Sequence, residues 1–267
     1  MIRRPAVAGL FYPADAAALR RDVADFLETP ADAADAPPKA LIVPHAGYVY
    51  SGAVAGAAYA RLRRRDPPPT RVILLGPVHR VPVRGLVVPK ADVFVTPLGD
   101  VAVDRAAIDR LAALPQVTVS ETAHAPEHSL EVQLPFLQSV LDDFTIVPLA
   151  VGDTTPDEVA EVLEMLWGGT ETLIVVSSDL SHYLPYAVAE RADRDTVDHI
   201  LRGDLLDSFE QACGALPIDG LLVAARRHGL TASLVARCNS GDTAGDRGRV
   251  VGYASIAFVE PEGVRHD

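Results

Sequence analysis

Short apolar runs alternate with helix-like patterns along most of this chain of 267 residues. Clear examples are ALIV at Ala40–Val43, RVILL from Arg71, and LIVV at Leu173–Val176. Continuous apolar runs of this length, bounded by turn residues, are typical of strands that are buried on both faces. The alternation predicts an α/β fold with a central, mainly parallel sheet and helices on both faces, in which the last two strands can be antiparallel.

Capping residues indicate where two of the helices begin. Asp104 is a candidate N-cap for a helix that runs to Leu114, and Thr155 is a candidate cap for the helical pattern that follows it. Between residues 86 and 104 the sequence predicts two short strands around turns. The next polar stretch, which contains His124 and His128, is predicted to be a loop that leads into a helix.

Charge and composition exclude several classes of protein. The formal net charge of −12 argues against a nucleic-acid partner, since phosphate binding needs clustered Lys and Arg. The two cysteines, Cys213 and Cys238, are too few for a disulfide scaffold. The N-terminal residues lack the apolar segment of a signal peptide, and no run has the roughly 20 apolar residues of a membrane span. We therefore expect a soluble, cytoplasmic protein without a membrane partner.

Polar side chains follow the ends of several predicted strands. His45 follows Ala40–Val43, His79 follows the next strand, and Asp179 and His182 follow the third. Ligands of open α/β sheets bind beyond the carboxyl ends of the strands, so these side chains are well placed for chemistry. Taken alone, each histidine can equally be a turn residue bonded to nearby carbonyls, and Asp179 can either orient a histidine or cap the following turn.

The two cysteines differ in their surroundings. Cys238 lies in the strand pattern SLVARC, where a free cysteine behaves as a small apolar residue. Cys213 lies in a turn, because Gly214 follows it and Pro217 stands near the start of the next helix. A helix N-terminus lowers the pKa of a thiol and favours the thiolate, which is the form that binds a metal. Together with histidines, Cys213 thus predicts a metal site.

Sequence signatures of other chemistries are absent. The chain has no Walker A sequence, no G-x-G-x-x-G, no G-x-S-x-G and no H-E-x-x-H. The stretch SSDLSH has the residue types of a hydrolase triad, but no serine lies on a nucleophile elbow. These absences disfavour a nucleotide-binding enzyme and a serine hydrolase.

Seven motifs resemble those of the Memo-like family, also called the AmmeMemoRadiSam system protein B family. They occur in family order between about residues 5 and 259: AGLFYP, PHAGYVYSG, LLGPVHR, EHSLEVQLPFL, SSDLSHY, ACGALPI and NSGDTAGDRGRVVGYAS. The resemblance covers nearly the whole chain and implies a single Memo-like domain, residues 1–267. It also implies a fold like that of the class III extradiol ring-cleavage dioxygenases.

The resemblance implies a division of roles among the site residues. The family's metal ligands are two histidines and a cysteine, which correspond here to His45, His79 and Cys213. The extradiol dioxygenases instead hold non-haem Fe(II) with two histidines and a carboxylate. His182 resembles the acid/base residue of those enzymes.

Two further residues carry over by motif. His128, in EHSLE, resembles a second active-site histidine, and Asp179 shares the SSD motif with His182. These three form the expected catalytic group.

The resemblance implies an Fe(II)-dependent, dioxygenase-like oxidoreductase that acts on an unknown small molecule. Because thiolate is a softer ligand than carboxylate, Cu and Zn are the other candidate metals. Two alternatives remain: a non-catalytic binding or redox-signalling scaffold on the same fold, and a metal-dependent hydrolase. The family also implies a protein partner from a radical-SAM system.

Overall fold

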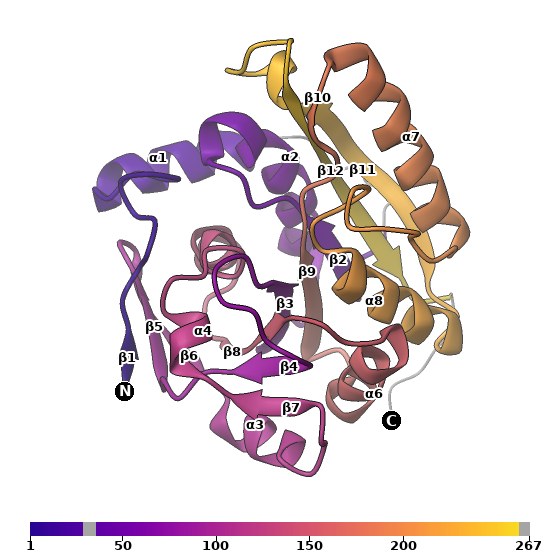
Figure 1. Cartoon of the computed structure of the whole chain (residues 1–267). Helices are drawn as coiled ribbons and strands as arrows, with labels where there is room; N and C mark the ends of the chain where they lie inside the picture. Colours follow the sequence, from indigo (N-terminus) through magenta and orange to yellow (C-terminus); the bar gives the residue numbers. More distant parts are fainter. Residues whose placement is uncertain (29–35, 262–267) are drawn as a thin grey trace.

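The structure is a computed structural model of the chain and describes residues 1–28 and 36–261. Within these residues one sheet of twelve strands forms the centre of the molecule (Figure 1). The strands are β1 (Ile2–Arg3), β2 (Ala40–Val43), β3 (Arg71–Pro77), β4 (Leu86–Val88), β5 (Val93–Thr96), β6 (Gly99–Val103), β7 (Val117–Val119), β8 (Thr145–Val151), β9 (Thr172–Ser177), β10 (His182–Leu184), β11 (Thr231–Asn239) and β12 (Val250–Val259).

The middle of the sheet is parallel and its margins are partly antiparallel. The order β6-β8-β3-β9-β2 is parallel throughout, and these strands carry the predicted buried runs. At one margin β12 pairs antiparallel with β2 and with β11, so the last two strands are antiparallel. At the other margin β5 pairs antiparallel with β6. The predicted α/β fold with a mainly parallel central sheet is confirmed.

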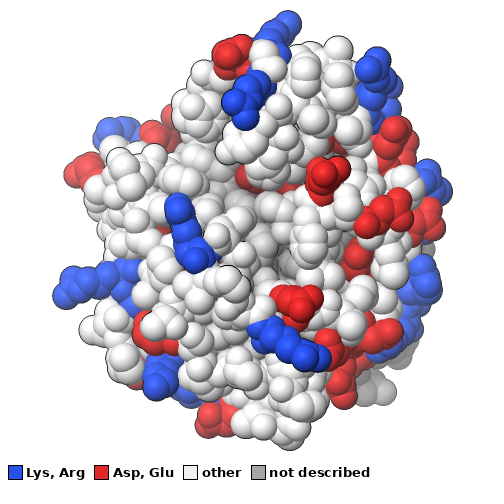
Figure 2. Space-filling model, in the orientation of Figure 1, with Lys and Arg blue, Asp and Glu red and all other residues white. Residues whose placement is uncertain are grey.

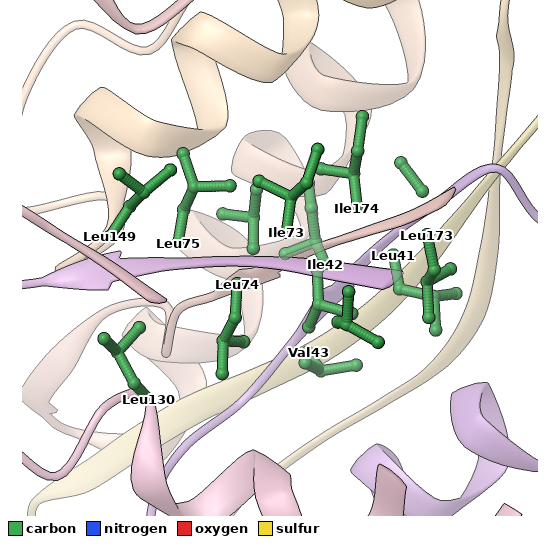
Figure 3. Close-up of a cluster of buried hydrophobic side chains, with 14 of the residues drawn as sticks. Leu41, Ile42, Val43, Ile73, Leu74, Leu75, Leu130, Leu149, Leu173 and Ile174 are labelled. Carbon is green, nitrogen blue, oxygen red and sulfur yellow. The ribbon is translucent and has the colours of Figure 1, made fainter. Parts of the chain in front are cut away.

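Helices flank the sheet in two groups. One group is formed by α1, α2 and α5, which contact one another, and the other by α3, α6 and α8, in which α6 contacts both others. Side chains of the central strands alternate between the two sides: Figure 3 shows Ile73 and Leu75 on one side of β3 and Leu74 on the other. All three are fully buried, so both faces of the parallel strands are covered. The helices are α1 (Ala16–Phe26), α2 (Tyr48–Ala60), α3 (Arg105–Leu111), α4 (Glu121–His124), α5 (Leu134–Val140), α6 (Pro156–Leu166), α7 (Tyr186–Arg202) and α8 (Ala215–Arg227).

Two glycines of α2 set how closely α1 approaches it. A Cβ at Gly56 would lie 2.4 Å from the backbone oxygen of Phe26, and one at Gly52 would lie 2.5 Å from the Phe26 ring. Any larger residue would push the helices apart, because protein interiors are close-packed. The close packing against α1 fixes the position of α2, whose N-terminus follows His45.

Local predictions agree with the structure at caps and differ where strands are short. Asp104 caps α3, and Thr155 caps α6 in a capping box with Glu158. The region from 86 to 103 contains three strands, β4 to β6, where two were predicted, and β7 lies in the predicted polar loop. His182 lies in β10, which pairs with β12, and not in a loop. Each helix in the described parts of the chain falls short, in length or in apolar character, of what a transmembrane span requires.

Candidate metal centre

Three neighbouring parallel strands deliver polar residues to one edge of the sheet. His45 lies two residues beyond β2, His79 two residues beyond β3, and Asp179 two residues beyond β9. Because β9 pairs in parallel with both β2 and β3, these ends lie side by side. His45 follows the predicted strand, now β2, and α2 starts three residues later at Tyr48. This edge is where open α/β sheets bind ligands.

The structure gathers three histidines at this edge. One potential ligand atom from each of His45, His79 and His128 lies within 4.8 Å of the others. The ring centroid of His45 lies 5.2 Å from that of His79 and 5.6 Å from that of His128. His45 is buried, whereas the side chain of His79 is 27% exposed. We call these three side chains the histidine cluster.

The hydrogen bonds of Ser177 determine the tautomer of His45. The Ser177 hydroxyl donates to the carbonyl of Ser129 at 2.6 Å and accepts from Nε2 of Gln133 at 2.8 Å. Because the hydroxyl has only one proton to donate, Ser177 Oγ must accept from His45 Nδ1, which lies 2.9 Å away. His45 Nε2 therefore carries a lone pair, and this lone pair faces the centre of the site.

Glu127 holds His79 in the same way. This buried carboxylate lies 2.9 Å from His79 Nδ1 and accepts from the His79 backbone N–H at 2.6 Å. It also accepts from the backbone N–H groups of His128 and Ser129. Burial works to raise the pKa of Glu127, but the hydrogen bonds and charge of His79 outweigh it and lower this pKa to about 2. An ionised carboxylate only accepts, so the proton is on His79 Nδ1 and Nε2 is free.

His128 has an unused nitrogen. Its Nδ1 is buried without a hydrogen-bond partner, because the 3.4 Å approach to Glu127 Oε1 lacks hydrogen-bond geometry. The ring stacks on His79 and meets the edge of Phe11. Burial, followed by the charge of His45, lowers the pKa of His128 to about 4. A neutral ring with an unpaired nitrogen costs free energy in a protein interior, and a bound cation would remove that cost.

Cys213 adds a sulfur beside the cluster. Its Sγ lies 3.3 Å from His45 Nε2 and 3.3 Å from the backbone nitrogen of Asp179. The sequence predicts a lowered thiol pKa at the start of α8, but burial, followed by the charge of Asp179, raises the pKa of Cys213 to about 12. The nearby carboxylate and the loss of solvent outweigh the helix terminus. The thiol of this site therefore stays protonated until a cation displaces the proton.

Asp179 and His182 lie close to the cluster in different ways. Asp179 is buried, and its Oδ1 accepts from the His45 backbone N–H at 2.7 Å. Asp179 therefore fixes the backbone of the loop that carries His45, and it does so without a hydrogen bond to the His45 ring. Burial raises the pKa of Asp179, and the charge of His182 acts in the opposite direction. His182 lies on β10, and within the described residues no hydrogen bond joins it to Asp179.

The donor atoms suit a transition metal. Imidazole nitrogens accommodate Fe, Cu, Zn or Ni, whereas Mg²⁺ and Ca²⁺ prefer oxygen ligands. The site offers Nε2 of His79, an unpaired nitrogen on His128, and the adjacent Nε2 of His45 and thiol of Cys213, which are hydrogen-bonded to each other. The sequence did not single out Glu127, Ser177 or Gln133, which orient these ligands. The only local signal for Glu127 is its position next to His128.

Comparisons with known proteins agree with the sequence motifs. The model of the "Memo-like protein" family matches residues 3–257. A MEMO1 family protein of Sulfolobus acidocaldarius is 37% identical, with 97% of this chain and 99% of the relative covered. Those of Methanococcoides burtonii and Archaeoglobus fulgidus are 38% and 39% identical, each with 96% of this chain and 99% of the relative covered. A crystal structure of an uncharacterized Escherichia coli K12 protein aligns with a TM-score of 0.47 at 13% identity, over 81% of this chain and 98% of that one.

Proposed function

This chain belongs to the Memo-like protein family, and from that membership and the site geometry we propose that it is a metal-dependent oxidoreductase. In this proposal His45, His79 and Cys213 hold Fe(II). The observation that carries it is the set of free donor atoms on one edge of the sheet, with Cys213 Sγ 3.3 Å from His45 Nε2. Iron(II) in such a site supplies one-electron chemistry and an open position for oxygen.

Hydrogen bonds within the chain orient the proposed histidine ligands before a metal binds. Ser177 and Glu127 hold the Nδ1 protons of His45 and His79, which turns each Nε2 toward the same point. Partners of this kind fix the ring orientation and raise the basicity of a metal-bound histidine. The two histidine rings then need little reorientation when a metal binds.

Proton transfer falls to His128, His182 and Asp179 in this proposal. His128 has a buried Nδ1 without a partner, so it can accept a proton from a substrate group that reaches the cluster. Asp179 is buried and its pKa is raised by burial, which favours holding a proton. His182 stands next to both on β10 and influences the pKa of Asp179.

One observation favours a second candidate, a zinc-dependent hydrolase. Three histidines with one open position are a common ligand set of catalytic zinc, and His128 completes such a set with His45 and His79. In that case Cys213 would lie beside the metal without binding it. The two candidates therefore differ in the third ligand as well as in the reaction.

Anaerobic titration with Fe(II), followed by oxygen uptake over a panel of catechols, tests the proposal. His45→Ala should lose both iron and oxygen uptake, because it removes a ligand. His182→Ala should retain most of the iron and lose turnover, since general acid–base groups contribute about 10²–10⁴-fold to rate without assembling the site. Loss of iron from His182→Ala as complete as from His45→Ala would contradict this division of roles. Zinc-supported hydrolysis without oxygen uptake would instead establish the second candidate.

A further inference from the structure

A cavity of about 320 Å³ opens next to the candidate metal centre. His79 and Cys213, two of the proposed ligands, lie in its wall. The rest of the wall comes from the ends of β3 and β8, the segments that follow them, Phe209 and the first turn of α8. A larger cavity of about 510 Å³, between β6 and α5, is lined by neither histidine nor cysteine. The smaller cavity is therefore the one in contact with the reactive groups.

Most side chains in the wall of this cavity are apolar. Besides His79 and Cys213, Asp153 is its one polar side chain, and neither Lys nor Arg lines it. The apolar part includes Val78, Val81, Val83, Phe209, Leu216 and Pro217. Figure 2 shows a hollow at the centre of the face viewed there, near the β9 label of Figure 1, bordered mostly by uncharged residues.

This lining discriminates by charge. An anion that entered would lose its hydration without meeting a cationic side chain, and burying an unpaired charge is costly. The buried, ionised carboxylate of Glu127, which is hydrogen-bonded to His79, would repel it further. A neutral molecule instead gains from the apolar wall, and 320 Å³ lies at the lower end of the usual range of about 300–1,000 Å³ for ligand pockets.

We propose that this cavity is the substrate site and that it selects a small, neutral, largely apolar molecule. This inference rests on the proposed function, because the metal at His79 and Cys213 would react with the molecule held there. Phe209 lines the cavity although it is 62% exposed, so it lies where the cavity meets solvent. Phe209 and Val81 are therefore specificity-determining residues.

Binding of benzyl alcohol and benzoate to the full chain, after its metal has been removed by chelation, tests this selection, because a bound metal ion would itself attract benzoate. The two probes share a ring and differ in charge, so calorimetry or ligand-observed NMR compares charge alone. The parent protein should bind benzyl alcohol at least about 10-fold more tightly than benzoate, a difference of about 1.4 kcal/mol. Equal binding of both probes would overturn the proposal.

A variant with a positive charge in the wall of the cavity provides the decisive test. Val81→Lys adds a cation to the cavity and should reverse the preference toward benzoate. Val188→Lys, on the exposed part of α7, makes the same change outside the cavity and should leave the preference unaltered. An equal shift in both variants would overturn the proposal. Phe209→Ala, at an exposed position, should weaken benzyl alcohol binding about 3–10-fold in any case, through loss of apolar contact.

Metal content separates a failure of this inference from a failure of the proposed function. The benzyl alcohol titration is therefore repeated after anaerobic addition of Fe(II), with bound iron measured in parallel. Normal iron binding without benzyl alcohol binding would overturn the cavity assignment alone. Benzyl alcohol binding that keeps its neutral preference in a protein unable to hold iron would support the cavity and contradict the iron site.

Discussion

Two buried polar clusters lie near one another in this molecule and differ in how completely their hydrogen bonds are used. In the first, Glu131 accepts from Arg3 Nη1 at 2.8 Å, from the Tyr12 hydroxyl, and from the backbone N–H groups of Ala6 and Val7. Arg3 also donates to three backbone carbonyls. We call this the Arg3–Glu131 network, and both of its charged side chains are almost fully buried.

The histidine cluster is equally polar but keeps donor atoms free. His79 uses only Nδ1, His45 Nε2 has only the weak thiol partner Cys213, and the buried Nδ1 of His128 has no partner. A saturated network holds the chain in place and has nothing left to bind. A cluster with free, preoriented nitrogens is destabilising until a ligand uses them, which is typical of functional sites. The comparison indicates that the first cluster serves stability and the second serves binding.

The largest expected effect is on the network. Glu131→Ala would leave Arg3 buried without its carboxylate, and breaking a buried pair in this way costs about 3–5 kcal/mol. The free energy of unfolding should fall by that amount in urea denaturation. Asp204→Ala removes one partner of the exposed pair with Arg202 and should cost less than about 1 kcal/mol. A similar small loss in both variants would remove the distinction between the two clusters.

The next effect concerns Cys213, the proposed third metal ligand. Cys213→Ser should weaken Fe(II) binding by more than the roughly 10–100-fold typical of residues that only orient a ligand. Cys238→Ser, on β11, should change it hardly at all. Anaerobic titration measures both, with His128→Ala alongside. If His128→Ala abolishes binding while Cys213→Ser does not, three histidines form the site and the assignment of Cys213 is wrong.

The smallest effect tests a residue that shares features of both clusters. The carboxylate of Glu127 accepts several hydrogen bonds, as that of Glu131 does, but its partners include the ring of His79. Glu127→Gln keeps the shape and loses the charge, so Fe(II) affinity should fall about 10-fold as His79 loses its fixed orientation. Glu121→Gln, at a half-buried carboxylate on α4 that accepts from the backbone N–H of Lys90, is the matched control. Unchanged affinity together with reduced stability would place Glu127 with the structural network.

Strand ends could be predicted because the information is local. The apolar runs that became β2, β3 and β9 are continuous in sequence, and the histidines directly follow two of them. Short strands were harder to predict: β4, β5 and β6 each hold only three to five residues, so periodicity gives little signal. The strand that carries His182, β10, is equally hard to predict, because its pairing depends on β12, far along the chain.

The sequence by itself determined the α/β architecture, the family, and which side chains reach the carboxyl edge of the sheet. Only the tertiary structure decided what those side chains are prepared to do. The tautomers of His45 and His79 depend on Ser177 and Glu127, which lie 132 and 48 residues away along the chain. The high pKa of the Cys213 thiol depends on burial and on Asp179, and neither can be read from the residues around it. Hydrogen-bond partners and desolvation arise from packing between distant segments, whereas strand and helix patterns arise within them.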